Sequence, residues 1–145
     1  MYHLVFQLSD GLNHSYQSTM VGKEGRRPRY AHLKKLDNAG PLLHDLLEIY
    51  WKGLHQKIPL FTETSYKFAK YLLEKEYDPD RALARARNKE WTSSKYNKWA
   101  EDADPYINIL FKNSEPIDTQ EFKNISLKLW KPIISHIEII ETLHE

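Results

Sequence analysis

The chain has 145 residues, of which 41% are hydrophobic and 12% aromatic, so it is long enough to bury one hydrophobic core as a single domain. Its formal net charge is only +1, so any attraction to a polyanion such as DNA depends on local clusters of Lys and Arg. The absence of cysteine excludes disulfides and thiolate metal sites, and it fits a reducing compartment, which makes the cytoplasm the expected location. No apolar run reaches membrane-spanning length, and the first residues lack the basic leader of a signal peptide.

Residues 1–37 are expected to contain the end of a helix and a β-hairpin. The apolar residues between positions 2 and 8 suit a buried strand by type, but they equally suit an apolar helix that Gly11 closes, and their periodicity does not decide between the two. The segments 15–21 and 29–33 are rich in residues that favour strands. Because the turn-forming residues 22–25 lie between them, the pattern predicts a hairpin.

Residues 38–145 are expected to be helical, and the helix that follows Asn38 is the most strongly indicated. Residues 38–41 carry cap and helix-start signals. The apolar residues at 42, 43, 46, 47, 50 and 54 then recur with a helical period, which ends near Gly53. Thr62 or Thr64 is expected to cap a further helix that stops near Tyr77.

Two aspartate–proline pairs predict further helix starts. Asp78-Pro79 places an N-cap and a first-turn proline before a helix expected to run through Trp91, and Asp104-Pro105 repeats the device. Asp118 and Glu121 have the spacing of a capping box for the last helix. Its apolar face is predicted to comprise Phe122, Ile125, Leu129, Ile133, Ile137 and Ile140, with a bend at Pro132. The predicted fold is mainly α with a small β-hairpin (α+β), in one domain spanning 1–145.

The motif chemistry gives no catalytic site or cofactor site. The sequence has no nucleophile elbow, P-loop or glycine-rich dinucleotide fingerprint, so we expect no enzyme activity and no bound ATP. Glu141-x-x-His144 is only one half of the paired set that a di-metal bundle site requires, so no metal site is predicted.

The group Asp118, Glu121 and Lys123 offers one enzymatic alternative, because metal-dependent nucleases use two carboxylates and a lysine. The carboxylates would hold Mg²⁺ and the lysine would stabilise developing charge. Such nucleases place these groups on adjoining strands, whereas the local pattern here is a helix start. Capping is therefore the preferred interpretation.

Two basic clusters are candidates for nucleic-acid contact. The first is on the hairpin, at Arg26, Arg27, Arg29, Lys34 and Lys35. The second combines cations with aromatic residues, which is the composition of a groove for single strands; its members are Arg81, Arg85, Arg87, Lys89, Trp91, Lys95, Lys98 and Trp99. The alternative is that both tryptophans anchor a core or an interface, and it is preferred because Glu101, Asp102 and Asp104 follow at once.

Several segments resemble the C-terminal domain of RecC, the gamma chain of bacterial exodeoxyribonuclease V. The main motif is Leu42-x3-Leu46-Leu47-x2-Tyr50-Trp51-x-Gly53-Leu54, followed by Pro59-Leu60-Phe61 and Thr64-Ser65-Tyr66-x2-Ala69. Weaker agreement extends over nearly the whole chain, at Tyr2-His3-Leu4, Thr19-Met20-Val21-Gly22-x2-Gly25, Trp91, Asp104-Pro105-Tyr106-x3-Leu110-Phe111 and Trp130-x-Pro132-Ile133.

The resemblance implies part of a larger subunit, namely the C-terminal part of a domain similar to PD-(D/E)XK nucleases but without their catalytic residues. It also implies membership of a heterotrimeric helicase–nuclease that degrades linear duplex DNA in double-strand break repair. ATP and Mg²⁺ would be bound by the RecB-like (beta) and RecD-like (alpha) chains, and this module would scaffold them together with the rest of the gamma chain. The alternative function is a stand-alone module that binds single-stranded DNA.

Overall fold

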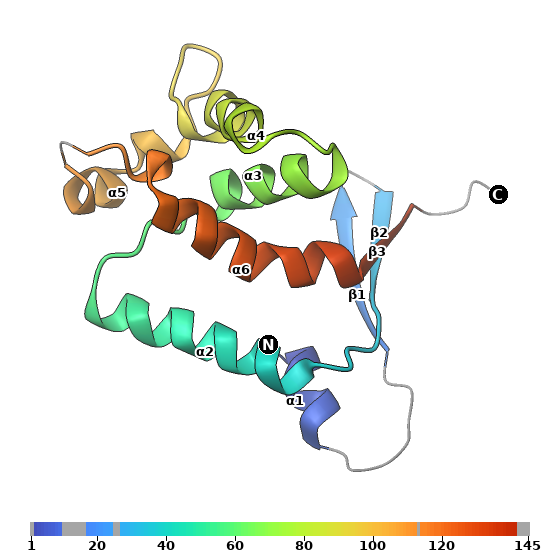
Figure 1. The fold of residues 1–145 in the computed structure, drawn as a ribbon. Coiled ribbons are helices and arrows are strands. Elements are labelled where there is room, and N and C mark those ends of the chain that lie inside the picture. The colour runs from blue at the N-terminus through green and yellow to red at the C-terminus, as the bar shows by residue number, and fades with distance from the viewer. Residues whose placement is uncertain (1, 10–16, 25–26, 113, 142–145) are drawn as a thin grey trace. The chain divides into compact units, whose positions relative to one another are not determined.

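The computed structural model describes residues 2–9, 17–24, 27–112 and 114–141. Its helical elements are α1 (Tyr2–Ser9), α2 (Ala39–His55), α3 (Thr62–Glu74), α4 (Pro79–Ala86), a π-helical turn (Arg87–Trp91), a 3₁₀ turn (Glu101–Ala103), α5 (Pro105–Leu110), a second 3₁₀ turn (Pro116–Asp118) and α6 (Gln120–His136), as Figure 1 shows. The strands are β1 (Ser18–Glu24), β2 (Arg27–Leu33) and β3 (Ile137–Glu141). The predicted class, mainly α with a small antiparallel sheet, is therefore confirmed.

The chain divides into two compact units, whose boundaries lie within α2 and α6. The first unit comprises residues 1–47 and 132–145, and the second comprises residues 48–131. Whether the two fold together as one domain stays a prediction. Among the described residues, none of the helices combines the length and the apolar character that crossing a membrane requires.

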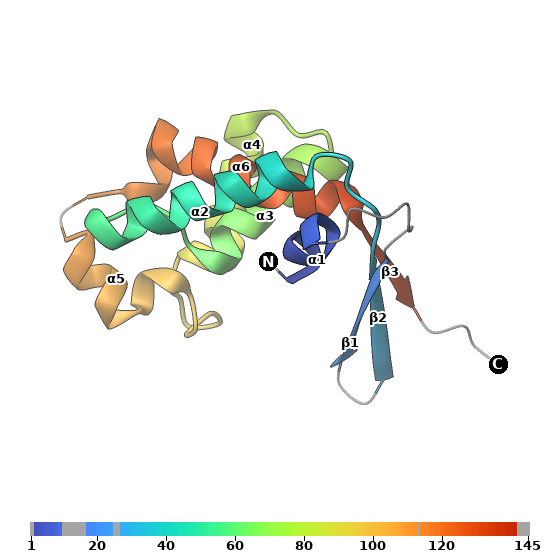
Figure 2. The same ribbon diagram turned by 90° about the horizontal axis from the view of Figure 1, so that it is seen from below.

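The first unit is built on a three-stranded antiparallel sheet with β2 in the middle (Figure 2). The predicted hairpin is confirmed, since β1 pairs with β2 from Ser18 opposite Leu33 to Glu24 opposite Arg27. The ambiguous N-terminal segment is helical, as α1. The His3 ring of α1 is buried, and its Nδ1 lies 2.7 Å from the Ser18 hydroxyl oxygen, which ties α1 to β1.

The predicted extent of the last helix was wrong. Ile137 and Ile140 were expected on its apolar face, but α6 ends at His136 and both residues belong to β3, which pairs with β2. The backbone N–H of Lys34 donates to the His136 carbonyl over 3.1 Å, at the point where the ladder begins. The run from Ile137 to Ile140 is rich in β-branched side chains, and the free edge of β2 supplies the pairing that favours a strand.

The second unit has an aromatic core between α3, α4 and the start of α6. The Phe61 and Trp91 rings lie 4.6 Å apart between centroids, and the Phe68 and Phe122 rings lie 5.7 Å apart. Ile117 is fully buried beside them. Rings at such separations contribute through burial and through the direct attraction between aromatic rings. Figure 1 shows α3 and α4 side by side.

Both aspartate–proline helix starts are confirmed. The Asp78 carboxylate accepts a hydrogen bond from the Arg81 backbone N–H over 3.0 Å at the start of α4. Asp104 accepts from the backbone N–H of Tyr106 over 2.7 Å, at the start of α5. Each proline is in the first turn, where no backbone N–H is needed.

The predicted cap of α3 was wrong, because neither Thr62 nor Thr64 fills that role. Phe61 occupies the N-cap position and makes no side-chain cap bond. Glu101, distant in sequence, instead accepts hydrogen bonds from the backbone N–H groups of Glu63 and Thr64, over 3.0 Å and 2.9 Å. A carboxylate satisfies the exposed N–H groups of a helix start and complements its dipole, and here it comes from another element.

The predicted capping box of α6 was also wrong in its residues. The Thr119 hydroxyl oxygen accepts from the Phe122 backbone N–H over 3.1 Å, so Thr119 is the cap. Asp118 lies in the preceding 3₁₀ turn, and its carboxylate pairs with the Arg87 guanidinium. Pro132 lies inside α6, which continues to His136, so the predicted bend stays a prediction.

Candidate functional site

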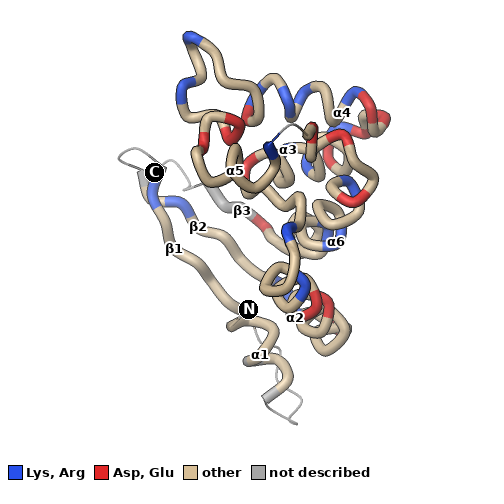
Figure 3. Tube along the Cα trace, turned by 90° about the vertical axis from the view of Figure 1, so that its left-hand side faces the viewer, with Lys and Arg blue, Asp and Glu red and all other residues tan. Residues whose placement is uncertain are grey.

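The basic and aromatic candidates predicted for DNA contact lie on α4, on the π-helical turn and on the loop that follows, all in the second unit. α4 begins at Pro79 because Asp78 caps it. The π-helical turn that follows ends at Trp91, where the Thr92 N–H donates a hydrogen bond to the Arg87 carbonyl over 2.9 Å. Figure 3 shows the Lys and Arg positions along α4 and on the protruding loop.

Three of the candidates contribute to the fold. Trp91 is 7% exposed and belongs to the core. Arg87 forms ion pairs with Asp118 and with Glu115, the latter over 3.6 Å. The Arg81 guanidinium stacks over the Tyr77 ring at 4.2 Å from its centroid. A tryptophan in this position cannot stack on a base without leaving the core, which supports the core interpretation for Trp91.

The remaining candidates, Arg85, Lys89, Lys95, Lys98 and Trp99, are all exposed. Trp99 is 97% exposed and the nearby Tyr96 is 93% exposed. The structure therefore brings two lysines and two aromatic rings together on one loop, from residue 92 to residue 99. Sequence spacing placed them near one another but could not separate the exposed Trp99 from the buried Trp91.

The acidic residues that follow this loop all bond to backbone N–H groups. Glu101 caps α3 and Asp104 caps α5. Asp102 accepts from the Ser93 backbone N–H over 2.8 Å and so fixes the start of the loop. Their spacing in the sequence indicated only a negative cluster, whereas in the structure each has a separate structural partner.

The alternative nuclease group is not assembled as a metal site. Glu121 pairs with Lys52, and Lys123 pairs with Asp80 over 3.4 Å. Because Asp118 pairs with Arg87, the three predicted groups contact three different partners. Asp118 lies in the 3₁₀ turn before α6, and Glu121 and Lys123 lie in its first turns, not on adjoining strands. In the part of the chain that the structure describes, no three His, Asp or Glu side chains gather closely enough to hold a metal ion. His144 and Arg26 lie outside the described residues.

A second exposed feature is an apolar patch on α2, formed by Tyr50, Trp51 and Leu54. All three side chains are mostly exposed, and Trp51 is 65% exposed. Ile49, which directly precedes Tyr50 on the same helix, is buried. The Trp51 ring is held by a contact with His55, whose Nδ1 donates to the Trp51 carbonyl over 2.8 Å. The apolar stripe predicted for this helix therefore extends onto the surface.

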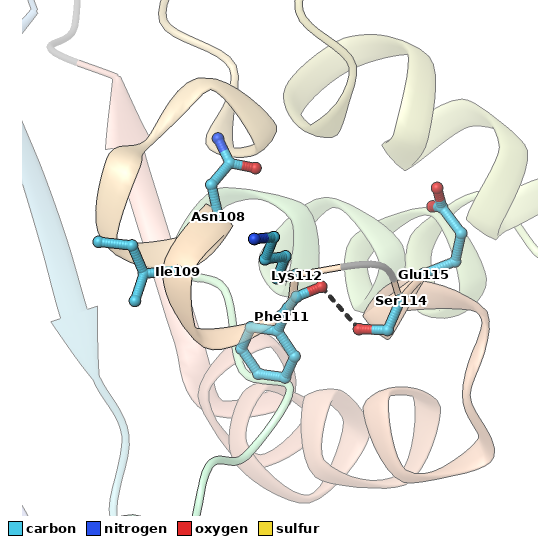
Figure 4. Close-up of a pocket in the computed structure, with 6 residues that line it drawn as sticks. All are labelled: Asn108, Ile109, Phe111, Lys112, Ser114 and Glu115. Carbon is cyan, nitrogen blue, oxygen red and sulfur yellow. Dashed lines mark hydrogen bonds between the residues drawn. The ribbon is translucent and has the colours of Figure 1, made fainter.

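A pocket of about 710 Å³ lies around the end of α5 (Figure 4). Its polar lining residues are Asn108, Lys112, Ser114 and Glu115. The Ser114 hydroxyl donates to the Phe111 carbonyl over 2.8 Å, so it is engaged by the backbone and has no neighbouring base among these residues. The lining offers no combination of groups for nucleophilic catalysis.

Lys70 on α3 has a perturbed acid–base equilibrium for structural reasons. Burial opposes its charged form, but the hydrogen bond to the Tyr66 hydroxyl and the charge of Glu74 outweigh burial and raise the pKa of Lys70 above its ordinary value. Its Nζ lies 3.3 Å from the Tyr66 hydroxyl. Lys70 is therefore fully protonated at neutral pH and is not a general base.

A family model described as the RecC C-terminal domain matches residues 1–73. These residues run from α1 through the hairpin and α2 to the last turn of α3, and they include the patch on α2. Neither a curated protein nor a solved structure shows significant similarity to the chain.

Proposed function

Because the chain belongs to the RecC C-terminal domain family, we propose that it is a non-catalytic docking module of a RecC-type (gamma) subunit. The complex would be a helicase–nuclease of the exodeoxyribonuclease V type, which acts on linear duplex DNA in double-strand break repair in the cytoplasm. The RecB-like and RecD-like chains would bind ATP and Mg²⁺ and would carry out the chemistry. This module would hold those chains together with the rest of the gamma chain.

The observation that carries the docking role is the patch formed by Tyr50, Trp51 and Leu54. It lies inside the matched residues, and its side chains are exposed although they are among the most apolar of the helix. Tyr and Trp are enriched among the residues that dominate binding energy at protein interfaces. A contiguous apolar patch on a helix is a common mark of a surface that another chain covers.

The charges beside the patch would leave it free for an apolar partner surface. Lys52, on the same helix, is paired with Glu121, and Glu48 is paired with Lys128 over 2.8 Å. The charges of Lys52 and Glu48 are thus each paired with an opposite charge within the protein. Covering the patch would not force either ion pair to lose its partner, which is the costly outcome when charges are buried at an interface.

Co-purification tests the proposal. The tagged chain is mixed with the beta chain, the alpha chain or the rest of the gamma chain, each separately, and retention is measured for the wild type and for Trp51→Ala combined with Leu54→Ala. We expect at least one partner to be retained and its affinity to fall about tenfold or more in the variant. Trp99→Ala, which removes a still more exposed tryptophan outside the patch, is the control. The proposal is contradicted if the wild type retains no partner. It is also contradicted if the wild type, the double variant and Trp99→Ala retain a partner equally.

The same proposal includes the absence of nuclease activity. Glu121 is engaged by Lys52 and Asp118 by Arg87, so neither carboxylate is arranged to hold Mg²⁺. The purified chain is expected to leave linear DNA intact with Mg²⁺ or Mn²⁺. Metal-dependent cleavage that Glu121→Ala abolishes would show the group to be catalytic.

A further inference from the structure

The loop from residue 92 to residue 99 presents two aromatic side chains to solvent almost completely. Tyr96 is 93% exposed and Trp99 is 97% exposed. Tryptophan and tyrosine are usually at least half buried in folded proteins, so nearly full exposure of both on one short loop calls for a physical reason. The loop lies entirely within the second unit, next to α4 (Figure 1).

Hydrogen bonds fix the loop in shape. Ser94 and Asn97 exchange two backbone hydrogen bonds, from the Ser94 N–H over 3.0 Å and from the Asn97 N–H over 3.2 Å. The Ser94 hydroxyl oxygen also lies within hydrogen-bonding distance of the Tyr96 and Asn97 N–H groups. Asn97 Nδ2 donates to the Lys89 carbonyl over 2.9 Å, which fastens the loop to the π-helical turn. A binding loop that is already ordered loses less entropy when it captures a ligand.

The free charge of the loop is positive. Among the residues that the structure describes, no carboxylate pairs with Lys95 or Lys98. The nearby acids have other partners: Glu90 pairs with Lys67 over 3.6 Å, and Asp102 accepts from the Ser93 N–H. Glu101 and Asp104 cap helices. The acidic cluster that made nucleic-acid contact less plausible from the sequence is therefore engaged by backbone donors.

The order of the residues matches the repeat of a single strand. Lys95 directly precedes Tyr96, and Lys98 directly precedes Trp99, so a cation adjoins an aromatic ring twice, three residues apart. Nucleic-acid strands repeat a phosphate and a base in the same way, and proteins that bind single strands join cations to stacking rings. Lysine is depleted at protein–protein interfaces, which makes a protein partner a poorer match for this loop.

We propose that residues 95–99 bind single-stranded nucleic acid, with Tyr96 and Trp99 stacking on bases and Lys95 and Lys98 contacting phosphates. Arg85 on α4 and Lys89 on the π-helical turn are also exposed and add two further cations to the same unit. Trp91 takes no part, since it is in the core. Stacking and phosphate contact do not distinguish bases, so the site recognises strands with little sequence preference. The inference is independent of the docking role of α2.

The test measures binding of the full chain to a fluorescently labelled oligothymidine of about fifteen nucleotides, a length within the range that single-strand sites cover. Fluorescence anisotropy gives the Kd, and quenching of tryptophan emission reports stacking. We expect Tyr96→Ala combined with Trp99→Ala to raise the Kd about tenfold or more. Lys95→Ala combined with Lys98→Ala should raise the Kd and also lower its dependence on salt concentration.

Matched controls remove an aromatic side chain and a lysine elsewhere on the surface. Tyr106 and Lys75 are both exposed, and Tyr106→Ala and Lys75→Ala should leave the Kd unchanged. A single-stranded RNA of the same length should bind to the chain with a Kd similar to that of the oligothymidine. Blunt duplex DNA should bind more weakly, because its bases are not free to stack on the loop. Absence of binding at low salt, or equal losses in the loop variants and the controls, overturns the proposal. So does a loop variant that releases a protein partner while its oligonucleotide binding is unchanged.

Discussion

At the scale of single residues, Glu101 shows how one side chain can hold two elements together. Its two carboxylate oxygens accept hydrogen bonds from the backbone N–H groups of Glu63 and Thr64 at the start of α3. These two residues lie 38 and 37 positions before Glu101 in the sequence. The role of such a residue depends on a contact that forms only in the folded chain. No local pattern predicts it, which is why Thr62 and Thr64 were the expected caps.

Replacing Glu101 therefore destabilises the second unit. Glu101→Ala is expected to lower the free energy of unfolding by about 1–2 kcal/mol, since it leaves two N–H groups at a helix start without an acceptor. Glu101→Gln keeps one acceptor oxygen and should have a smaller effect. Urea denaturation followed by circular dichroism measures both variants. An alanine variant as stable as the wild type would show that water replaces the carboxylate at no cost.

The tryptophans give a second prediction at this scale. Trp91 packs on Phe61 in the core, whereas Trp99 touches almost nothing. Trp91→Ala should lower the free energy of unfolding by about 3–5 kcal/mol, and Trp99→Ala should change it by no more than about 0.5 kcal/mol. Thermal denaturation of the two variants distinguishes them. Similar losses in both would mean that Trp99 is covered in solution.

At the scale of elements, the helices whose start is encoded locally were predicted from sequence. Asp78-Pro79 and Asp104-Pro105 each supply an acceptor and a suitable first residue within a few positions, so their helices begin where expected. The strand β3 was missed because its partner β2 is about a hundred positions away, and only that pairing turns Ile137 to Ile140 from a helical face into a strand. The exposure of the apolar stripe of α2 could not be predicted from the local sequence either. The helical spacing of apolar residues shows which of them share a face, but it does not show what covers that face.

The pairing of β3 can be tested through its backbone. Because Lys34 bonds to His136, the alternation of an antiparallel ladder makes the next hydrogen-bonded pair His32 with Glu138. Glu138→Pro removes the backbone N–H of Glu138, which is a donor in this pair. The hydrogen exchange of the β2 amides, measured by mass spectrometry, should therefore accelerate. Glu138→Ala breaks only the 3.2 Å ion pair with Lys34 and serves as the control. Unchanged exchange in the proline variant would contradict the ladder.

At the scale of the whole molecule, two compact units share the long helices α2 and α6, and the matched residues 1–73 include parts of both units. The similarity noted from sequence beyond residue 73, at Trp91, at Asp104 to Phe111 and at Trp130, stays a prediction, as does the relation to an inactive nuclease fold. Family membership could be recognised from the motif that begins at Leu42, which includes Tyr50, Trp51 and Leu54. That these three side chains are exposed could not be predicted, because exposure is a property of the folded chain.

The central claim is that the chain acts by docking, with the Tyr50, Trp51 and Leu54 patch as its contact. The most direct test is isothermal titration of the chain with the beta chain, the alpha chain and the rest of the gamma chain at several temperatures. Burial of an apolar patch predicts binding to at least one of them with a negative heat-capacity change, which becomes smaller in Trp51→Ala combined with Leu54→Ala. Absence of binding to all three, or binding whose affinity and heat-capacity change are the same in that variant, would contradict the claim.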